Sequence, residues 1–285
     1  MTTGIKNEEL TAIGGIVSQD GRAVTLPGGG TICSVQPPHG FENAADPLFM
    51  AQSGVYFAVK VASELKKIEA DDSLSEIGKL RKIVPMHAQN ARAAATVMQD
   101  VERNASAAKG DLEAFYAPPP STNDVASVMV DAEARQRIRD LQGAALSKFL
   151  GGLVENVAND PRLERMVVGL VRSPLPLTTN AEMAVEAAWR NLCEARRPDE
   201  LGKLKARVTL ADWAMTISEQ ALSAVAGRIE KTRAALATSS DINAARNLRE
   251  SVFAALDEHD HTRPMIPRFG FHPEEIAIMR RARAA

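Results

Sequence analysis

Apolar residues recur along most of the chain at steps of three and four, the spacing that places side chains on one face of an α-helix. The first such stretch covers residues 46–68 and aligns Val55, Val59 and Ala62. Asp46 followed by Pro47 suits its beginning, because aspartate accepts the free N–H groups of a first turn and proline has no N–H to satisfy. The same spacing predicts further helices over residues 73–109, 121–153, 160–173, 179–192, 209–236, 241–258 and 273–284.

Proline and glycine interrupt this pattern at defined points. Pro85 lies inside the second predicted helix and should kink or break it near Val84. Two glycines at 151–152 should bend the third helix near its end, and Pro198 with Asp199 should separate two later ones. Three consecutive prolines within residues 117–120 predict a stiff connector, the best candidate for a boundary between subdomains.

The first forty residues follow a different pattern. Short β-prone runs cover 13–18, 22–26 and 31–35, and Asp20-Gly21 separates the first two. Asp-Gly between such runs favours a hairpin, because glycine adopts the positive φ that the turn requires. A sheet of two or three strands is marginal alone, so this segment should depend on helices or on another chain.

These patterns together predict a mainly α protein: an elongated multi-helix bundle with a small N-terminal β-hairpin or three-stranded segment. The predicted division is a β-like segment over 1–42, a helical hairpin over 43–116 with its kink near Pro85, a helical bundle over 121–258, and a loop with a C-terminal helix over 259–285. No repeat of about 33 to 45 residues and no sustained heptad pattern is present, which argues against a solenoid or a simple coiled coil.

Composition changes the expected packing. Hydrophobic residues make up 45% of the chain but aromatic residues only 4%, and alanine is abundant. Alanine favours helix formation yet removes little surface from water. The helices should therefore approach one another closely, or bury their faces against a partner.

Charge and cysteine content restrict the function classes. A net charge of −2 with both signs interspersed is not the footprint of a general nucleic-acid binder. Arg280, Arg281 and Arg283 at the C-terminal end are typical of a solvated helix end. The N-terminal residues do not follow the pattern of a secretory signal, and no apolar run is long enough to span a membrane. We therefore expect neither a signal peptide nor a membrane span. Two cysteines, Cys33 and Cys193, define no disulfide framework and favour a reduced, cytoplasmic-type environment. The expected location is the cytoplasm or, for a structural subunit of a virus, the virion.

No catalytic residue and no cofactor is predicted from the motifs. Gly28, Gly29 and Gly30 resemble a phosphate-binding loop only superficially, since no Lys-Ser/Thr pair opens a helix after them. A flexible turn is the preferred interpretation. Cys193 lies on an amphipathic helix, where cysteine usually packs as a small hydrophobic residue.

His259 and His261 are the first candidates for metal ligands. Two histidines one residue apart can both reach a metal from an extended chain, and Glu258 or Asp260 could complete the set. The alternative is that they cap a helix C-terminus, where histidine is also favoured.

The candidate interface residues are Met265, Ile266, Phe269 and Phe271, together with Trp213. The first four lie in a proline-containing connector that is unusually apolar and should be covered. The connector either packs back across the bundle or docks onto another subunit. Trp213, like Trp189, is either a core anchor or an interface residue, where tryptophan is over-represented.

We therefore expect a non-enzymatic helical interaction or assembly protein: a scaffold, an adaptor or a structural subunit of a larger complex such as a virion. A protein partner or self-assembly is the expected form of binding. The alternatives are a metal-supported enzyme led by His259 and His261, and a helical effector or chaperone that binds a partner protein.

Overall fold

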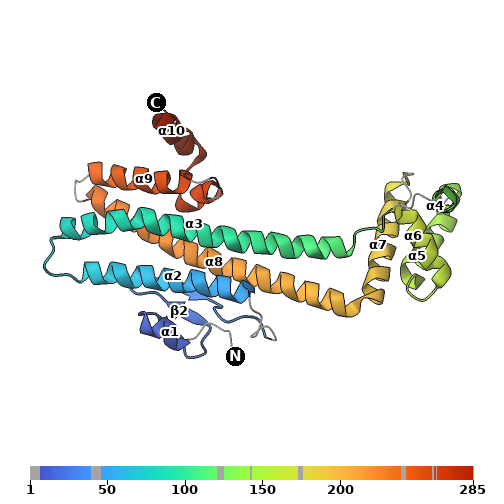
Figure 1. The fold of residues 1–285 in the computed structure, drawn as a ribbon, viewed down its shortest axis with the longest axis horizontal. Helices are drawn as coiled ribbons and strands as arrows, with labels where there is room; N and C mark the ends of the chain where they lie inside the picture. Colours follow the sequence, from blue (N-terminus) through green and yellow to red (C-terminus); the bar gives the residue numbers. More distant parts are fainter. Residues whose placement is uncertain are drawn as a thin grey trace. The chain divides into compact units, whose positions relative to one another are not determined.

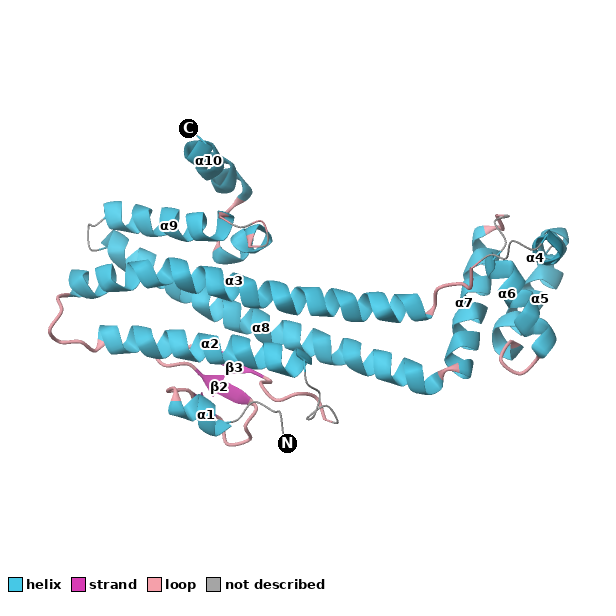
Figure 2. Cartoon of the chain, viewed as in Figure 1, coloured by secondary structure: helices cyan, strands magenta, loops and turns pink. Residues whose placement is uncertain are grey.

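The chain is mainly α-helical, with a three-stranded antiparallel sheet near its N-terminus, as predicted (Figure 2). The computed structural model describes residues 7–39, 46–120, 125–141, 143–172, 176–238, 242–258, 260 and 262–284, and only the backbone of 46–50, 126, 127 and 130. Its elements are α1 (Asn7–Ala12), β1 (Ile16–Val17), β2 (Ala23–Thr25), β3 (Thr31–Cys33), α2 (Asp46–Glu69), α3 (Glu76–Phe115), α4 (Val125–Asp140), α5 (Gly143–Asn156), α6 (Pro161–Arg172), α7 (Thr179–Arg196), α8 (Pro198–Thr238), α9 (Ile242–Asp257), the 3₁₀ helix η1 (Arg263–Phe269) and α10 (Pro273–Ala284).

Two compact units share these elements. Unit 1 comprises Met1–Ala107 and Thr209–Ala285, and unit 2 comprises Ala108–Val208. Both α3 and α8 begin in one unit and end in the other, so unit 1 is discontinuous in sequence. This division differs from the four consecutive segments expected from the sequence, because contiguous helical patterns do not indicate which helices pack together.

The sheet of unit 1 has the order β1-β2-β3. Its register pairs Val17 with Val24 and Val24 with Ile32. The turn between β1 and β2 contains Gly21 at φ 68°. This is the positive φ that the Asp-Gly pair predicted for a hairpin turn. Val24 and Ile32 are fully buried, so the sheet adds one apolar face to the core of unit 1.

Helices α2, α3 and α8 lie side by side in unit 1 (Figure 1). Many of the buried residues between them are alanines, whose short side chains let helix backbones approach closely. These are Ala51, Ala58, Ala62, Ala91, Ala94, Ala95, Ala214, Ala221 and Ala226.

Helix α8 supplies the support that the small sheet was expected to need. Trp213 donates from Nε1 to the carbonyl of Ser34 at 2.9 Å, and the N–H of Cys33 donates to Oε1 of Gln220 at 2.7 Å. Arg228 donates to the carbonyls of Pro27 and Gly29. Three side chains of α8 therefore hold the backbone at the end of β3 and the preceding loop of residues 27–30, called the glycine loop below.

Arg249 joins the C-terminal elements of unit 1. Its guanidinium donates to Glu230 of α8 at 2.8 Å, to Glu275 of α10 at 3.0 Å and to the carbonyl of Gly270 at 2.9 Å. It also lies 4.1 Å from the centroid of the Phe271 ring.

Glu275 in turn accepts from the N–H of His272 at 2.9 Å, which caps α10. These contacts hold the pKa of the Glu275 carboxyl below its usual value. The hydrogen bond from the backbone of His272 lowers it most, and Arg249 lowers it less.

In unit 2, α4 packs on α6, α6 on α7, and α5 on α7. The core contains mainly branched aliphatic residues: Ile138, Leu150, Leu153, Val157, Val167, Leu170, Val185 and Leu192. Arg135 of α4 is only 7% exposed and donates to Glu182 of α7 at 2.7 Å. Its Nε donates to the carbonyl of Leu170 at 2.8 Å, near the end of α6, where carbonyls lack partners within the helix.

Three expected helix boundaries differ from the structure. The pattern over 121–153 contains two helices, since α4 ends at Asp140 and α5 begins at Gly143, whose φ of 55° is not helical, while residues 151–152 lie inside α5. Pro198 begins α8 instead of interrupting it, as proline suits a first helical position, so no helix starts at Thr209. Helix α3 continues through Pro85 without a break, since its residues pack on both sides of the proline; the kink expected near Val84 stays a prediction.

The connector over 263–271 contains the 3₁₀ helix η1 and not only a loop. Among the described residues, no helix combines the length and the apolar character that crossing a membrane requires.

Candidate functional site

His259 and His261, the predicted metal ligands, lie outside the described residues. Within the part of the chain that the structure describes, no three His, Cys, Asp or Glu side chains are grouped so that they could hold a metal ion. The metal site therefore stays a prediction.

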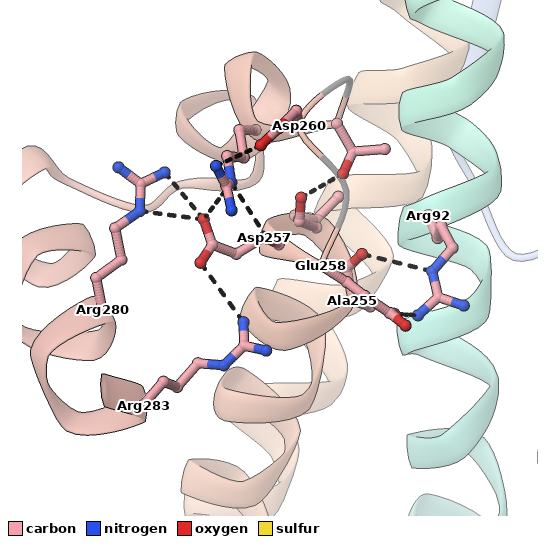
Figure 3. A network of polar contacts seen from close by, with 10 residues as sticks. Arg92, Ala255, Asp257, Glu258, Asp260, Arg280 and Arg283 are labelled. Atoms are coloured by element: carbon pink, nitrogen blue, oxygen red, sulfur yellow. Dashed lines mark hydrogen bonds and ion pairs between the residues drawn. The ribbon is translucent and has the colours of Figure 1, made fainter. Parts of the chain in front are cut away.

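The segment around these histidines contains a network of arginines and carboxylates (Figure 3). Asp257, the last residue of α9, has a largely buried side chain and accepts from Arg280 at 2.9 Å and from Arg283 at 3.5 Å, both on α10. Arg263 lies 3.4 Å from the same carboxylate and also pairs with Asp260. A carboxylate at a helix C-terminus is unfavourable by itself, and these cations offset its charge. Two of the three C-terminal arginines thus attach α10 to α9, where a solvated helix end was expected.

The apolar connector is covered within unit 1. Met265, Ile266, Phe269 and Phe271 are all buried in its main core, and Phe271 packs against Phe253 with ring centroids 5.5 Å apart. Packing back across the bundle, one of the two alternatives for this segment, accounts for its composition. A role of these residues at an interface with another chain stays a prediction.

The two tryptophans also have partners in the chain. Trp213 is partly buried against the core of unit 1 and donates its hydrogen bond to Ser34. Trp189 of unit 2 donates from Nε1 to the carbonyl of Tyr116 at 2.7 Å and packs beside Phe115 and Cys193. The interface role of Trp213 stays a prediction.

Cys193 is buried among Phe115 and Leu201. Burial raises the pKa of its thiol, although Arg197 acts in the opposite direction. A neutral, enclosed thiol is the environment of a packing cysteine and not of a nucleophile.

The glycine loop has a geometry opposite to that of a phosphate cradle. A phosphate-binding loop directs backbone N–H groups at the anion, whereas here carbonyls of residues 27 and 29 point at Arg228. Gly28, Gly29 and Gly30 have φ values of 77°, 102° and 92°, a run that only glycine adopts readily. The loop therefore serves first to bind the arginine, and it forms one wall of a pocket in unit 1.

An exposed apolar stripe on α4 was not identified as such from the sequence. Val125 is 72% exposed, Val128 45% and Met129 68%. Their spacing of three and four residues places them on one face of the helix. Periodicity had indicated an apolar face there, but it does not reveal whether the chain itself covers that face.

Comparisons with protein-family models, with curated proteins and with solved structures found no match to this chain.

Proposed function

We propose that this chain is a non-enzymatic interaction or assembly protein that binds another protein chain through α4. The observation that supports it is the stripe of Val125, Val128 and Met129 on one face of that helix. Single apolar residues are common on protein surfaces, but three at helical spacing form a continuous strip.

The spacing of the stripe matches a known mode of recognition. Helices that bind in an apolar groove present anchors at positions i, i+3 and i+4, as these residues do. Arg135, two turns further along α4, ties the helix to α6 and α7. The stripe is thus carried on a helix that is fixed to its unit, which lowers the entropy lost on binding.

The test removes the stripe and keeps the helix. Val125→Gln, Val128→Gln and Met129→Gln together replace apolar side chains with a residue of good helix propensity. Sedimentation over a concentration series, with affinity capture from the native source, should show self-association or a specific partner for the wild type. The triple variant should weaken that binding about tenfold or more.

Matched controls are Met183→Gln in unit 2 and Ile242→Gln in unit 1, which remove single exposed apolar residues of 65% and 70% exposure elsewhere. Both should bind as the wild type does. A wild-type chain that stays monomeric at high concentration and captures no specific partner would contradict the proposal. Equal binding by the triple variant and the controls would also contradict it.

A further inference from the structure

Unit 1 contains a pocket of about 580 Å³ that the proposed α4 interaction does not use. Its walls are the glycine loop, the end of α2, the start of α3 and the C-terminal half of α8. The volume lies within the range of sites for small molecules, roughly 300–1,000 Å³. Part of the lining is apolar, with Leu65, Leu80, Ile83 and Ala224, and the remainder is polar or charged.

Three cationic side chains line the pocket. Arg228 has N–H donors without acceptors, and Lys231 has no ion-pair partner, among the described residues. Lys79 pairs with Glu76 at 3.2 Å. Arg228 uses Nη2 for the carbonyls of residues 27 and 29, while its Nε and Nη1 have no hydrogen-bond partner in the described chain. Lys231 is exposed and forms no ion pair with any described residue. Glu69 and Glu76 also line the pocket, so the lining carries an excess of one positive charge, and both carboxylates belong to exposed residues.

A buried pair beside the cations leaves one hydrogen without an acceptor. Nε2 of His87, a fully buried residue, lies 2.9 Å from Oγ1 of Thr232, which lines the pocket. Nδ1 of His87 has no partner among the described residues. Burial, and to a lesser degree Arg228, lowers the pKa of His87 to about 4, so the ring is neutral and carries one N–H.

The position of that N–H decides where the unpaired hydrogen lies. If it is on Nδ1, a buried donor is left unpaired, which is costly. If it is on Nε2, it donates to Thr232 and leaves Nδ1 as an unpaired acceptor, and the hydroxyl of Thr232, a residue that lines the pocket, keeps its own hydrogen to donate. The second arrangement moves the unsatisfied donor to the pocket wall, where a ligand oxygen can accept it.

We propose that this pocket binds a small organic anion, an apolar body that carries a carboxylate, sulfonate or phosphate group. The anionic group accepts from Arg228 and Thr232 and pairs with Lys231, and the body covers Leu65, Leu80 and Ile83. A surface lysine, a spare arginine N–H or an apolar wall also occurs singly in proteins that bind no ligand. Their convergence on one cavity, with Arg228, Lys231 and Thr232 on α8 and the apolar side chains of Leu65, Leu80 and Ile83 on α2 and α3, is the arrangement of a ligand site.

The experiment compares two probes that differ in the anionic group. Anilinonaphthalene sulfonate carries a sulfonate on an aromatic body, and N-phenyl-1-naphthylamine has the same body without it. Fluorescence titration of the full chain should give saturable binding of the sulfonate at one site. Lys231→Gln should weaken it about tenfold and Arg228→Gln about 10- to 100-fold, while binding of the neutral probe stays unchanged with Lys231→Gln.

Lys60→Gln is the matched control, because Lys60 is an exposed lysine of unit 1 outside the pocket lining. Since Arg228 also holds the glycine loop, Lys231→Gln decides the outcome if Arg228→Gln fails to fold. Absence of saturable sulfonate binding to the wild type would overturn the proposal, as would equal affinities of Lys231→Gln and Lys60→Gln. Neither result bears on the α4 stripe, whose test uses different residues and a protein partner.

Discussion

Alanines fill much of the helix packing in unit 1, whereas leucine, isoleucine and valine dominate the core of unit 2. Between α2, α3 and α8 the small side chains let long helices lie close together, so backbone proximity replaces side-chain bulk. In unit 2 the helices are short and larger side chains fill the space between them. One alanine-rich composition therefore averages over two kinds of core.

The units also differ in whether the chain itself covers their apolar segments. Unit 1 covers its apolar connector and anchors its sheet through Trp213, Gln220 and Arg228 of α8. Unit 2 leaves the apolar stripe of α4 exposed, although Arg135, about two turns further along, clamps the same helix to α6 and α7. Unit 1 also exposes large apolar side chains, but Ile16, Ile77, Ile242 and Ile278 lie on four different elements, whereas unit 2 exposes three on one face of α4. Four experiments test this contrast.

The largest effect is expected from Arg135→Ala in unit 2. Its loss leaves the carbonyl of Leu170 and the carboxylate of Glu182 without their buried cation. The Glu182 side chain is 43% exposed, so water solvates part of the freed carboxylate, and losing the two hydrogen bonds of the buried guanidinium should cost about 3–4 kcal/mol of unfolding free energy. Chemical denaturation would measure it, with Arg137→Ala as control because the Arg137–Glu133 pair is exposed and worth no more than about 0.5 kcal/mol. Equal losses in the two variants would contradict the clamp.

Acid should weaken unit 1 through His87. Its pKa is about 4 when folded and near 6.5 when unfolded, so between these values the unfolded chain binds the extra proton. Stability is therefore full above pH 6.5 and falls as the pH drops towards 4, by about 3 kcal/mol. His87→Gln, which keeps a donor for Thr232, should remove this part of the slope. Urea titrations of the wild type and of His87→Gln between pH 7 and 4.5 would measure the difference. If the unfolding free energies of the two proteins fall in parallel with pH, His87 is not the group responsible.

Overpacking should harm the alanine interfaces of unit 1. Ala95 is fully buried on α3, and Ala95→Leu inserts three carbon atoms where the helices lie close. A loss of about 1–3 kcal/mol is expected from strain. Thermal unfolding would detect it, and Ala107→Leu, at an exposed position of the same helix, should be neutral within about 0.5 kcal/mol. Tolerance of Ala95→Leu would show that these helices are loosely packed.

The smallest effect concerns the tie between α8 and the sheet. Trp213→Phe keeps most of the ring and loses the hydrogen bond to Ser34. About 1 kcal/mol should be lost. Amide exchange of β3 should rise in the variant, whereas exchange in α6 should not. Unchanged exchange in β3 would mean that Gln220 and Arg228 suffice to hold the sheet.

Local chemistry made much of the fold predictable from the sequence. The Asp-Gly turn, the strands around it and the beginning of α2 at Asp46 follow from φ preferences and capping, which act within a few residues. The boundary at Gly143 could not be predicted, since glycine also occurs inside helices, as at Gly151 and Gly152. Pro198 was misassigned because proline both ends helices and begins them.

Little of the candidate sites could be predicted in the same way. Gly28, Gly29 and Gly30 were identified as a turn, but their partner Arg228 lies 199 residues beyond Gly29 along the chain. His87 and Thr232 are separated by 145 residues and carry no motif in common. Val125, Val128 and Met129 lie within the helix predicted over 121–153, and only the folded chain shows that their side chains stay exposed while α4 packs on α6.

Helix content, the small sheet and the membership of each apolar face follow from the amino-acid order, because they depend on backbone preferences and on spacing within one element. The folded chain was needed to learn which faces are covered, which arginine meets which carboxylate, and where a pocket remains. Those outcomes depend on side chains from distant segments meeting in space, which periodicity along one segment does not specify.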